Sequence, residues 1–369
     1  MSPAKCFFFT LAWLWAIPIL AGSSIKPDEE VIFYPALARP VAGGWQIDIH
    51  GLVYEPEKHG TTTALLRRLM GIDEESLTKE ERKIFRQRMA YFLVDNERHK
   101  GVTVLADNEP FRFGTSTANG HFNGRWEWPT NKSTFANWFG TASNGLTRLE
   151  LPLAPGGGRT CPIDIHFLTD TGWSVISDID DTIKISEVRD REALLRNTFC
   201  RPFRPVPGMA NRYRQWQTEN RVQFHYVTAS PWQLYLPLTQ FALSNDFPAG
   251  TFHMKQFRVK DSSVWSLFKS PQKYKRDIIE PLLGRFPQRA FVLVGDSGEK
   301  DPEIYGELAR RHPEQVRRIF IRNVTGEAAD AARYRQAFRG VPAKVWQVFV
   351  EPSELPERLE PQDADAVTY

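Results

Sequence analysis

Three carboxylates that follow a short apolar run constrain this chain more than any other feature. Val175 and Ile176 precede Asp178, Asp180 and Asp181. Such a run is typical of a buried central strand, and carboxylates crowded at its end repel one another unless a cation or a protonation event relieves the repulsion. The acids at 178 and 180 share one face of an extended backbone. The stretch therefore predicts a functional site, with an acidic turn or a calcium loop as the alternatives.

The composition is that of a globular protein. The chain has 369 residues, of which 41% are hydrophobic and 25% are charged, and its formal net charge is +3. This length is sufficient for two domains. The mild charge balance predicts no nucleic-acid partner and does not specify an oligomeric state.

The amino terminus has the pattern of an export signal. Lys5 precedes an apolar run over 6–21, and small residues follow at 22–24. This pattern is typical of a signal peptide, and the run is short for a membrane-spanning helix. We therefore expect residues 1–23 to be a signal peptide of an exported protein, periplasmic or secreted. The alternative is an uncleaved leader that tethers the protein to a membrane.

Residues 24–155 are expected to form a β-rich domain. Apolar and polar residues alternate over 45–51, and further strand patterns separated by turn residues predict a small β-sandwich. Two helices are expected to interrupt it, at 61–70 and 79–90. Thr78 and Glu81 form a capping box that opens the second helix, and we expect this helix to pack on the sandwich.

A glycine run at 156–158 is expected to mark the domain boundary. Beyond it, predicted strands at 175–177, 222–227, 291–294, 318–322 and 345–350 alternate with predicted helices at 189–196, 209–218, 231–242, 273–283 and 302–310. The alternation predicts a doubly wound α/β domain over 156–352, which binds its ligand beyond the carboxyl ends of the strands. Residues 353–369 are expected to form a C-terminal tail.

Polar side chains follow two more of the predicted strands. Thr228 and Ser230 come after the strand at 222–227 and open a helix, where hydroxyls and free amides suit a phosphate oxygen. Alternatively, Ser230 is only the helix N-cap. Asp296 ends the strand at 291–294, and Asp301 follows five residues later. We expect both groups to lie near the acids of the first strand.

These stretches resemble the motifs of the haloacid-dehalogenase-type phosphatases, whose first motif is matched by Asp178, Asp180 and Thr182. The resemblance implies that Asp178 attacks phosphorus, forming an aspartyl-phosphate, and that Asp180 is the general acid and base. It implies that Thr228, or else Ser230, binds the substrate phosphate. The third motif implies that Lys275, or else Lys273, neutralises the nucleophile and the phosphoryl group.

The same resemblance implies a magnesium ion. Its expected ligands are Asp178, Asp180, Asp296 and Asp301, since hard oxygen ligands are what Mg²⁺ prefers. The implied fold of the catalytic half is a doubly wound, Rossmann-like haloacid-dehalogenase sheet, preceded by the small β-sandwich.

The sequence at residues 178–184, 226–232 and 295–305 resembles one family more closely, the phosphatidate phosphatase catalytic domain of the yeast actin-patch type. This resemblance covers about residues 160–350. It implies Mg²⁺-dependent hydrolysis of phosphatidate to diacylglycerol and phosphate, with a phospholipid substrate as the partner. Thr228 and Ala229 stand where Ser and a larger polar residue are expected, which blurs the choice of substrate. The alternatives are a phosphatase of another phosphomonoester, either soluble or on a protein, and a non-catalytic exported binding module.

Two further features have two interpretations each. Arginines and aromatics lie between the first two motifs, among them Arg201, Arg204 and Trp216. They form either a membrane-facing rim that holds anionic headgroups or a solvated helix face with a core tryptophan. Cys161 and Cys200 form either one disulfide in an oxidising compartment or two buried free thiols.

Overall fold

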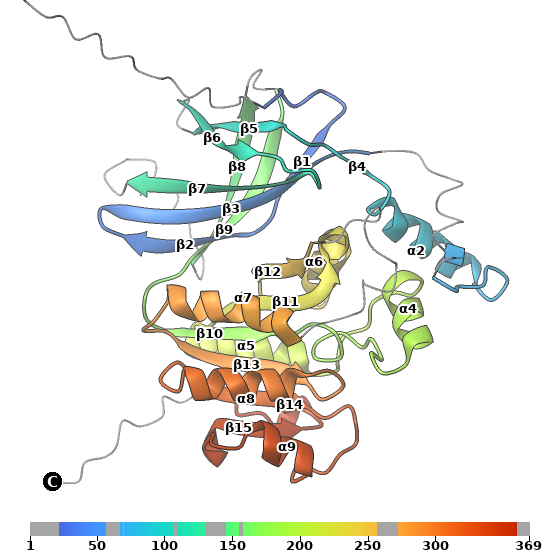
Figure 1. The fold of residues 1–369 in the computed structure, drawn as a ribbon, viewed down its shortest axis with the longest axis vertical. Helices are drawn as coiled ribbons and strands as arrows, with labels where there is room; N and C mark the ends of the chain where they lie inside the picture. Colours follow the sequence, from blue (N-terminus) through green and yellow to red (C-terminus); the bar gives the residue numbers. More distant parts are fainter. Residues whose placement is uncertain are drawn as a thin grey trace, which may run out of the picture.

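The computed structural model describes residues 22–56, 67–68, 70–106, 109–129, 145–154, 158–256 and 272–359 (Figure 1). Residues 1–21 of the expected leader, most of the helix expected at 61–70, the glycines at 156–157 and the end of the expected tail lie outside these ranges. Within the described ranges, no helix is both long and apolar enough to cross a membrane.

The first half of the chain is a curled nine-stranded sheet with its own apolar core. The strand order is β1-β3-β2-β9-β8-β5-β6, and β4 and β7 also pair with β3. The bounds are β1 Glu30–Phe33, β2 Ala36–Val41, β3 Gly44–Glu55, β4 Asp95–Asn96, β5 Gly101–Ala106, β6 Glu109–Thr115, β7 His121–Pro129, β8 Leu146–Ala154 and β9 Thr160–Phe167. Hydrogen bonds thus join the strands of the expected sandwich into one sheet.

The last strand of this sheet lies beyond the expected boundary at 155/156. β9 pairs antiparallel with β8 and parallel with β2, so the chain leaves the first sheet only after Phe167. The second sheet begins at Trp173. The glycine run therefore falls in the connection between two paired strands, where turn residues are equally common.

The second half is an α/β unit built on six parallel strands. The order is β12-β11-β10-β13-β14-β15, and all five neighbouring pairs are parallel. The bounds are β10 Trp173–Ser177, β11 Gln223–Pro231, β12 Gly250–Lys255, β13 Ala290–Asp296, β14 Val316–Arg322 and β15 Trp346–Phe349. The α/β class predicted from the alternation is confirmed. The strand order reverses between β10 and β13, where open α/β sheets form ligand sites at their carboxyl edge.

Helices cover both faces of this sheet because successive side chains of its strands point to opposite sides. Val175 packs in one apolar cluster with Trp216 of α5 and Leu238 of α6, whereas Ile176 packs in another with Ile279 of α7 and Leu308 of α8. The bounds are α4 Arg191–Phe199, α5 Met209–Asn220, α6 Tyr235–Ser244, α7 Gln272–Arg285, α8 Asp301–Arg311 and α9 Ala332–Ala337.

The helix expected at 231–242 begins later than predicted. β11 continues to Pro231, a short 3-10 turn η1 follows at Trp232–Leu234, and α6 starts at Tyr235. Pro231 is extended, with φ −76° and ψ 156°. Ser230 is therefore not the N-cap of a helix that starts at 231. Its hydroxyl instead donates to Oδ2 of Asp180 at 3.2 Å.

Helix α2, Lys79–Ala90, has the predicted capping box, but it packs on a different surface from the one expected. Its buried Phe85 and Met89 belong to the apolar cluster of the α/β half. The guanidinium of Arg88 donates to the carbonyl of Thr198 at 2.7 Å. The expected packing on the sandwich is therefore wrong, since the apolar face of a helix does not specify which of two cores it covers.

The two halves meet through aromatic and polar contacts. Tyr34 of the first half lies against Trp232, with ring centroids 4.0 Å apart. Arg285 pairs with Asp48 at 2.9 Å. Cys161 and Cys200 lie in different apolar clusters, one in each half, and both are buried free thiols.

Candidate active site

The carboxyl ends of β10, β11 and β13 bring the predicted site residues together. β10 pairs with both of the other strands, so its end lies between theirs. The amide of Asp178 donates to the carbonyl of Val294 on β13 at 2.8 Å, which anchors the first acid beside the end of that strand. The acids are thus adjacent in space because their strands are adjacent in the sheet.

Three of the four expected metal ligands form one buried cluster. Asp178, Asp296 and Asp301 each offer an oxygen, and these oxygens lie within 4.8 Å of one another. The three residues are 2%, 0% and 0% exposed. So complete a burial of three carboxylates requires positive charge beside them.

Lys275 supplies one positive charge at this cluster. Its ammonium lies 2.9 Å from Oδ1 of Asp178, 2.6 Å from Oδ1 of Asp301 and 3.1 Å from Oε2 of Glu299. Lys275 is 1% exposed, whereas Lys273 is exposed on the same helix. Of the two lysines left open by the sequence, Lys275 is the one that contacts the acids.

One ammonium against these carboxylates leaves an excess of negative charge. Burial and the neighbouring carboxylates raise the pKa of Asp178 well above its usual range, although Lys275 opposes the shift. The pKa of Asp296 is raised by the same causes. A divalent cation bound here would oppose both shifts.

The hydrogen bonds of these acids show where such a cation fits. Oδ1 of Asp296 accepts from the amide of Gly298 at 2.6 Å, but its buried Oδ2 has no hydrogen-bond partner among the residues that the structure describes. Asp301 is saturated by comparison, because Oδ1 contacts Lys275 and Oδ2 accepts from the amide of Asp296 at 3.2 Å. An orphaned buried carboxylate oxygen beside a second carboxylate suits a hard cation such as Mg²⁺.

Gly295 keeps this arrangement compact. A Cβ at this position would lie 2.2 Å from Oδ2 of Asp301. The close approach lets Asp301, at the first turn of α8, reach the end of β13. A larger residue at 295 would force the Asp301 carboxylate away from Lys275.

Asp180 stands apart from the three-acid cluster. Its Oδ1 contacts the ammonium of Lys184 at 2.6 Å and accepts from the hydroxyl of Ser186 at 2.7 Å. Its Oδ2 accepts from the hydroxyls of Thr228 at 3.1 Å and Ser230 at 3.2 Å. Both candidate phosphate-binding hydroxyls therefore converge on Asp180, and its side chain is not one of the clustered oxygen ligands.

These contacts decide the protonation state of Asp180. Burial alone would raise its pKa, but Lys184 and the hydroxyl donors outweigh burial and hold the pKa at about 2. Asp180 is therefore ionised at neutral pH in the resting site. In that state it is a base.

Thr182 and Asp181 hold the loop that carries these acids. The hydroxyl of Thr182 donates to Oδ2 of Asp178 at 3.1 Å, which orients the first carboxylate. Asp181 has a left-handed backbone, with φ +54°, and its carboxylate accepts three backbone amides of residues 186–188 at 2.7–2.8 Å. Arg322 donates to its carbonyl at 2.7 Å. Asp181 thus shapes the turn instead of facing the clustered acids.

Sequence reasoning did not identify Lys184 or Glu299 as site residues. Lys184 is 1% exposed although it lies in a loop, and Glu299 is a further carboxylate on Lys275. The only signal for either residue was its place inside a motif, four residues after Asp180 and three after Asp296. Such spacing does not reveal an ion pair when the backbone is irregular.

A cleft of about 420 Å³ lies in front of Asp180 and is open to solvent. Asp180, Ser230 and Glu299 give it a polar side, and Leu194, Phe199 and Leu234 belong to its apolar side. Its lining residues are Asp180, Val188, Leu194, Thr198, Phe199, Ala229, Ser230, Pro231, Leu234 and Glu299. A phosphate ester with an apolar alcohol portion matches this division of chemistry.

The arginine-rich rim considered in the sequence is divided in the structure. Trp216 is 0% exposed and its indole donates to the carbonyl of Pro356 at 2.7 Å. Arg201 pairs with Glu81 at 3.2 Å, and Arg214 pairs with Asp246 at 3.1 Å. Trp216 is therefore a core residue, as the second of the two interpretations of the sequence predicted, and its ring does not enter a membrane interface.

Residues 173–323 match the family model described as phosphatidate phosphatase APP1, catalytic domain. The match begins with β10 and ends just after β14, so it contains all eight predicted site residues.

Two curated relatives are similar to this chain. Phosphatidate phosphatase APP1 of Saccharomyces cerevisiae is 34% identical over 215 residues, which are 53% of this chain and 36% of the relative. An uncharacterized protein of Schizosaccharomyces pombe is 29% identical over 168 residues, which are 44% of this chain and 27% of the relative. The chain thus spans about a third of the length of the relatives it matches.

Solved structures add nothing to this comparison. A ferredoxin-NADP+ reductase from Plasmodium falciparum aligns over 80% of this chain and 95% of its own, with a TM-score of 0.20 and 8% identity. A likeness this low bears on neither fold nor function.

Proposed function

We propose, on the premise that residues 173–323 belong to the phosphatidate phosphatase APP1 catalytic-domain family, that this protein is a phosphoric monoester hydrolase that acts on phosphatidate. It would release diacylglycerol and phosphate. The observation that carries the proposal is the buried cluster of Asp178, Asp296 and Asp301 at the edge of β10 and β13, in which Oδ2 of Asp296 has no hydrogen-bond partner among the described residues. We also propose that the α/β half is a domain of the haloacid-dehalogenase type.

In the proposed reaction, Asp178 is the nucleophile. One of its carboxylate oxygens forms a bond to phosphorus, the ester P–O bond breaks, and the released alcohol oxygen takes a proton. Thr182 and Lys275 support this role because each holds one oxygen of the carboxylate in place. Asp296 and Asp178 would hold Mg²⁺, which when bound supplies positive charge for the phosphoryl oxygens.

Asp180 serves the second half of the reaction. Its ionised carboxylate takes a proton from the water that attacks the aspartyl-phosphate, which restores the free Asp178 carboxylate and releases phosphate. In the first half, the negative charge of the bound phosphate opposes ionisation of Asp180, and the protonated carboxyl gives its proton to the leaving alcohol. The four contacts from Lys184, Ser186, Thr228 and Ser230 support this role by fixing the carboxylate at the edge of the cleft.

The choice of phosphatidate over other esters rests on two observations. The yeast relative is named a phosphatidate phosphatase, and it is 34% identical over the matched segment. The cleft before Asp180 has an apolar side. A soluble phosphomonoester or a phosphoprotein as substrate remains the alternative with the same chemistry, and a non-catalytic exported binding module is the alternative without it.

Phosphate release by the purified protein tests this proposal. We expect release from phosphatidate in mixed micelles that depends on Mg²⁺ and exceeds release from p-nitrophenyl phosphate in kcat/KM. The Asp178→Asn protein is the matched control, because it keeps the shape of the side chain. Release from p-nitrophenyl phosphate alone would support the soluble-ester alternative, and no release from either substrate would support the binding module.

A further inference from the structure

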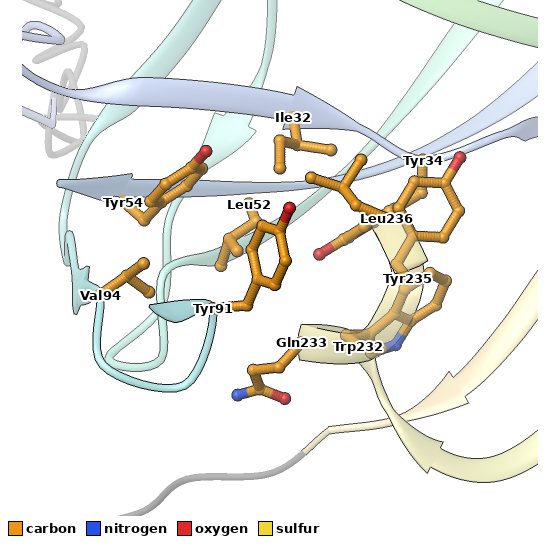
Figure 2. Close-up of a pocket in the computed structure, with 10 residues that line it drawn as sticks. All are labelled: Ile32, Tyr34, Leu52, Tyr54, Tyr91, Val94, Trp232, Gln233, Tyr235 and Leu236. Atoms are coloured by element: carbon orange, nitrogen blue, oxygen red, sulfur yellow. The ribbon is translucent and has the colours of Figure 1, made fainter. Parts of the chain in front are cut away.

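A second pocket opens between the two halves of the molecule (Figure 2). Its empty volume is about 300 Å³, which includes open solvent. Strands β1 and β3 form one wall, the segment after α2 forms another, and η1 with the start of α6 forms a third. The lining residues are Ile32, Tyr34, Leu52, Tyr54, Tyr91, Val94, Trp232, Gln233, Tyr235 and Leu236.

The lining predicts an apolar ligand. None of these ten residues is charged, and nine of them are aliphatic or aromatic. Most are only partly buried, although they gather in a concave surface, and Leu236 at the rim is 37% exposed. When an apolar ligand covers partly exposed apolar side chains in a concave surface, the free energy of the system falls.

The floor of this pocket is rigid. Tyr34 is 2% exposed, and its ring lies 4.0 Å from that of Trp232 and 4.8 Å from that of Tyr235, measured between centroids. The ring of His50 lies below, 4.7 Å from Trp232. Rings packed in tilted and edge-to-face contacts have little freedom left to lose when a ligand binds, which lowers the entropic cost of binding.

The pocket shares a wall with the catalytic cleft. Leu234 lines the cleft, whereas its chain neighbours Gln233 and Tyr235 line the apolar pocket. Ser230, which contacts Asp180, precedes Gln233 by three residues, and three residues of backbone span at most about 11 Å. Ser230, at the edge of the catalytic cleft, therefore lies within about 11 Å of a residue that lines the apolar pocket.

We propose that this pocket binds an acyl chain of the phospholipid whose phosphate reacts at Asp178. The inference rests on the proposed function and adds to it a site for the apolar part of the substrate. The segment 230–236, which runs from the end of β11 through η1 to the start of α6, then has two roles. Its first residue contacts Asp180, and its last residues contact the acyl chain. Substrates with an acyl chain are favoured over phosphomonoesters without one.

Leu236→Gln tests this site, with Leu243→Gln as the matched control. Leu243 lies on the same helix and is 80% exposed, but it does not line the pocket. The substrates are dioctanoyl phosphatidate, kept below the concentration at which it forms micelles, and p-nitrophenyl phosphate. We expect Leu236→Gln to lower the ratio of the two kcat/KM values by at least about fivefold, as loss of part of a leucine contact requires, and Leu243→Gln to leave the ratio unchanged.

A second variant approaches the pocket from the opposite wall. Val94→Trp narrows the pocket without a substitution in α6, and we expect the same fall in the ratio of the two kcat/KM values. An unchanged ratio in both lining variants would overturn the proposal. Equal losses in Leu236→Gln and Leu243→Gln, seen on phosphatidate vesicles but not on the dispersed lipid, would also overturn it, because α6 would then be a membrane-docking face.

Binding without turnover separates this inference from the proposed function. Dioctanoyl phosphatidate is titrated calorimetrically into Asp178→Asn and into the double variant Asp178→Asn/Leu236→Gln. We expect the second protein to bind at least about fivefold more weakly. If the wild type releases no phosphate while this difference is present, the proposed hydrolysis fails and the pocket stands; if the wild type is active and the two proteins bind equally, the pocket fails and the hydrolysis stands.

Discussion

The ammonium of Lys184 lies 2.6 Å from Oδ1 of Asp180, and both side chains are largely withdrawn from solvent, at 1% and 14% exposure. Ser186 contacts both groups. This ion pair holds the second acid of the motif away from the three-acid cluster of Asp178, Asp296 and Asp301. The protonation state of Asp180 therefore depends on Lys184.

Lys184→Met is expected to raise the pKa of Asp180, because burial then acts without its main opposing charge. The acidic limb of the kcat profile for p-nitrophenyl phosphate should move to higher pH, because the ionised carboxylate is needed in the second half of the reaction, and kcat should fall by at least about tenfold, a typical scale for a misplaced acid–base group. Lys273→Met, at an exposed position on α7, is the control. An acidic limb at the wild-type pH in Lys184→Met would contradict this assignment.

Asp178→Asn is expected to abolish turnover, because an amide cannot serve as the attacking carboxylate. Asp180→Asn should also be inactive in turnover, but it should accumulate the aspartyl-phosphate, since the attacking water then lacks its base. Intact-mass measurement after mixing with substrate detects the covalent phosphoryl group. Substantial turnover by Asp178→Asn would remove the proposed mechanism.

Asp296→Ala is expected to weaken activation by Mg²⁺ more than Asp301→Ala does. Asp296 has a buried oxygen without a hydrogen-bond partner in the described part of the chain, whereas the oxygens of Asp301 contact Lys275 and a backbone amide. We expect the Mg²⁺ concentration for half-maximal activity to rise at least about tenfold in Asp296→Ala, and calorimetric titration of Mg²⁺ into each protein to follow the same order. Asp301→Ala should mainly lower kcat, because Lys275 loses a partner. Equal losses of Mg²⁺ affinity in the two variants would argue against this placement.

Buried histidines near the junction of the two halves predict loss of stability in acid. Burial lowers the pKa of His50 to about 3 and those of His121, His166 and His253 to about 4, and it holds that of His225 well below its usual value. Neighbouring His121 and His253 add to the effect on His50, and Arg285 adds to the effect on His253.

Acid lowers the free energy of unfolding because the unfolded state binds protons that the folded state does not. Histidines of the unfolded chain take up protons below their pKa of about 6.5, while the buried histidines of the folded protein stay neutral down to about pH 4. The free energy of unfolding should therefore fall as pH decreases from about 6.5 to about 4, by on the order of 3 kcal/mol for each fully buried histidine. Urea unfolding at several pH values measures this slope. His121→Gln should reduce the slope, with the exposed His99→Gln as the control, and a pH-independent stability in the wild type would refute the account.

Local sequence predicted which residues come together at the candidate site. Apolar runs ending in Asp178, Thr228 and Asp296 predicted three strands, and neighbouring parallel strands necessarily align their carboxyl ends, so the location of the site followed from the pattern. The α/β class and the capping box of α2 followed in the same way. These features depend on residues close together in the chain, whose periodicity and backbone preferences are legible without knowledge of the fold.

Only the tertiary structure decided which basic groups the acids contact. That Lys275 and not Lys273 reaches the acids depends on which face of α7 packs on the sheet, and that Asp180 turns toward Lys184 depends on an irregular loop held by Asp181. The packing of α2 on α4 and the course of β9 past the glycine run were equally hidden, because a helix face or a strand does not encode its partner. The apolar pocket beside the catalytic cleft unites residues from Ile32 to Leu236, and contacts across such separations are set by the burial of the whole chain.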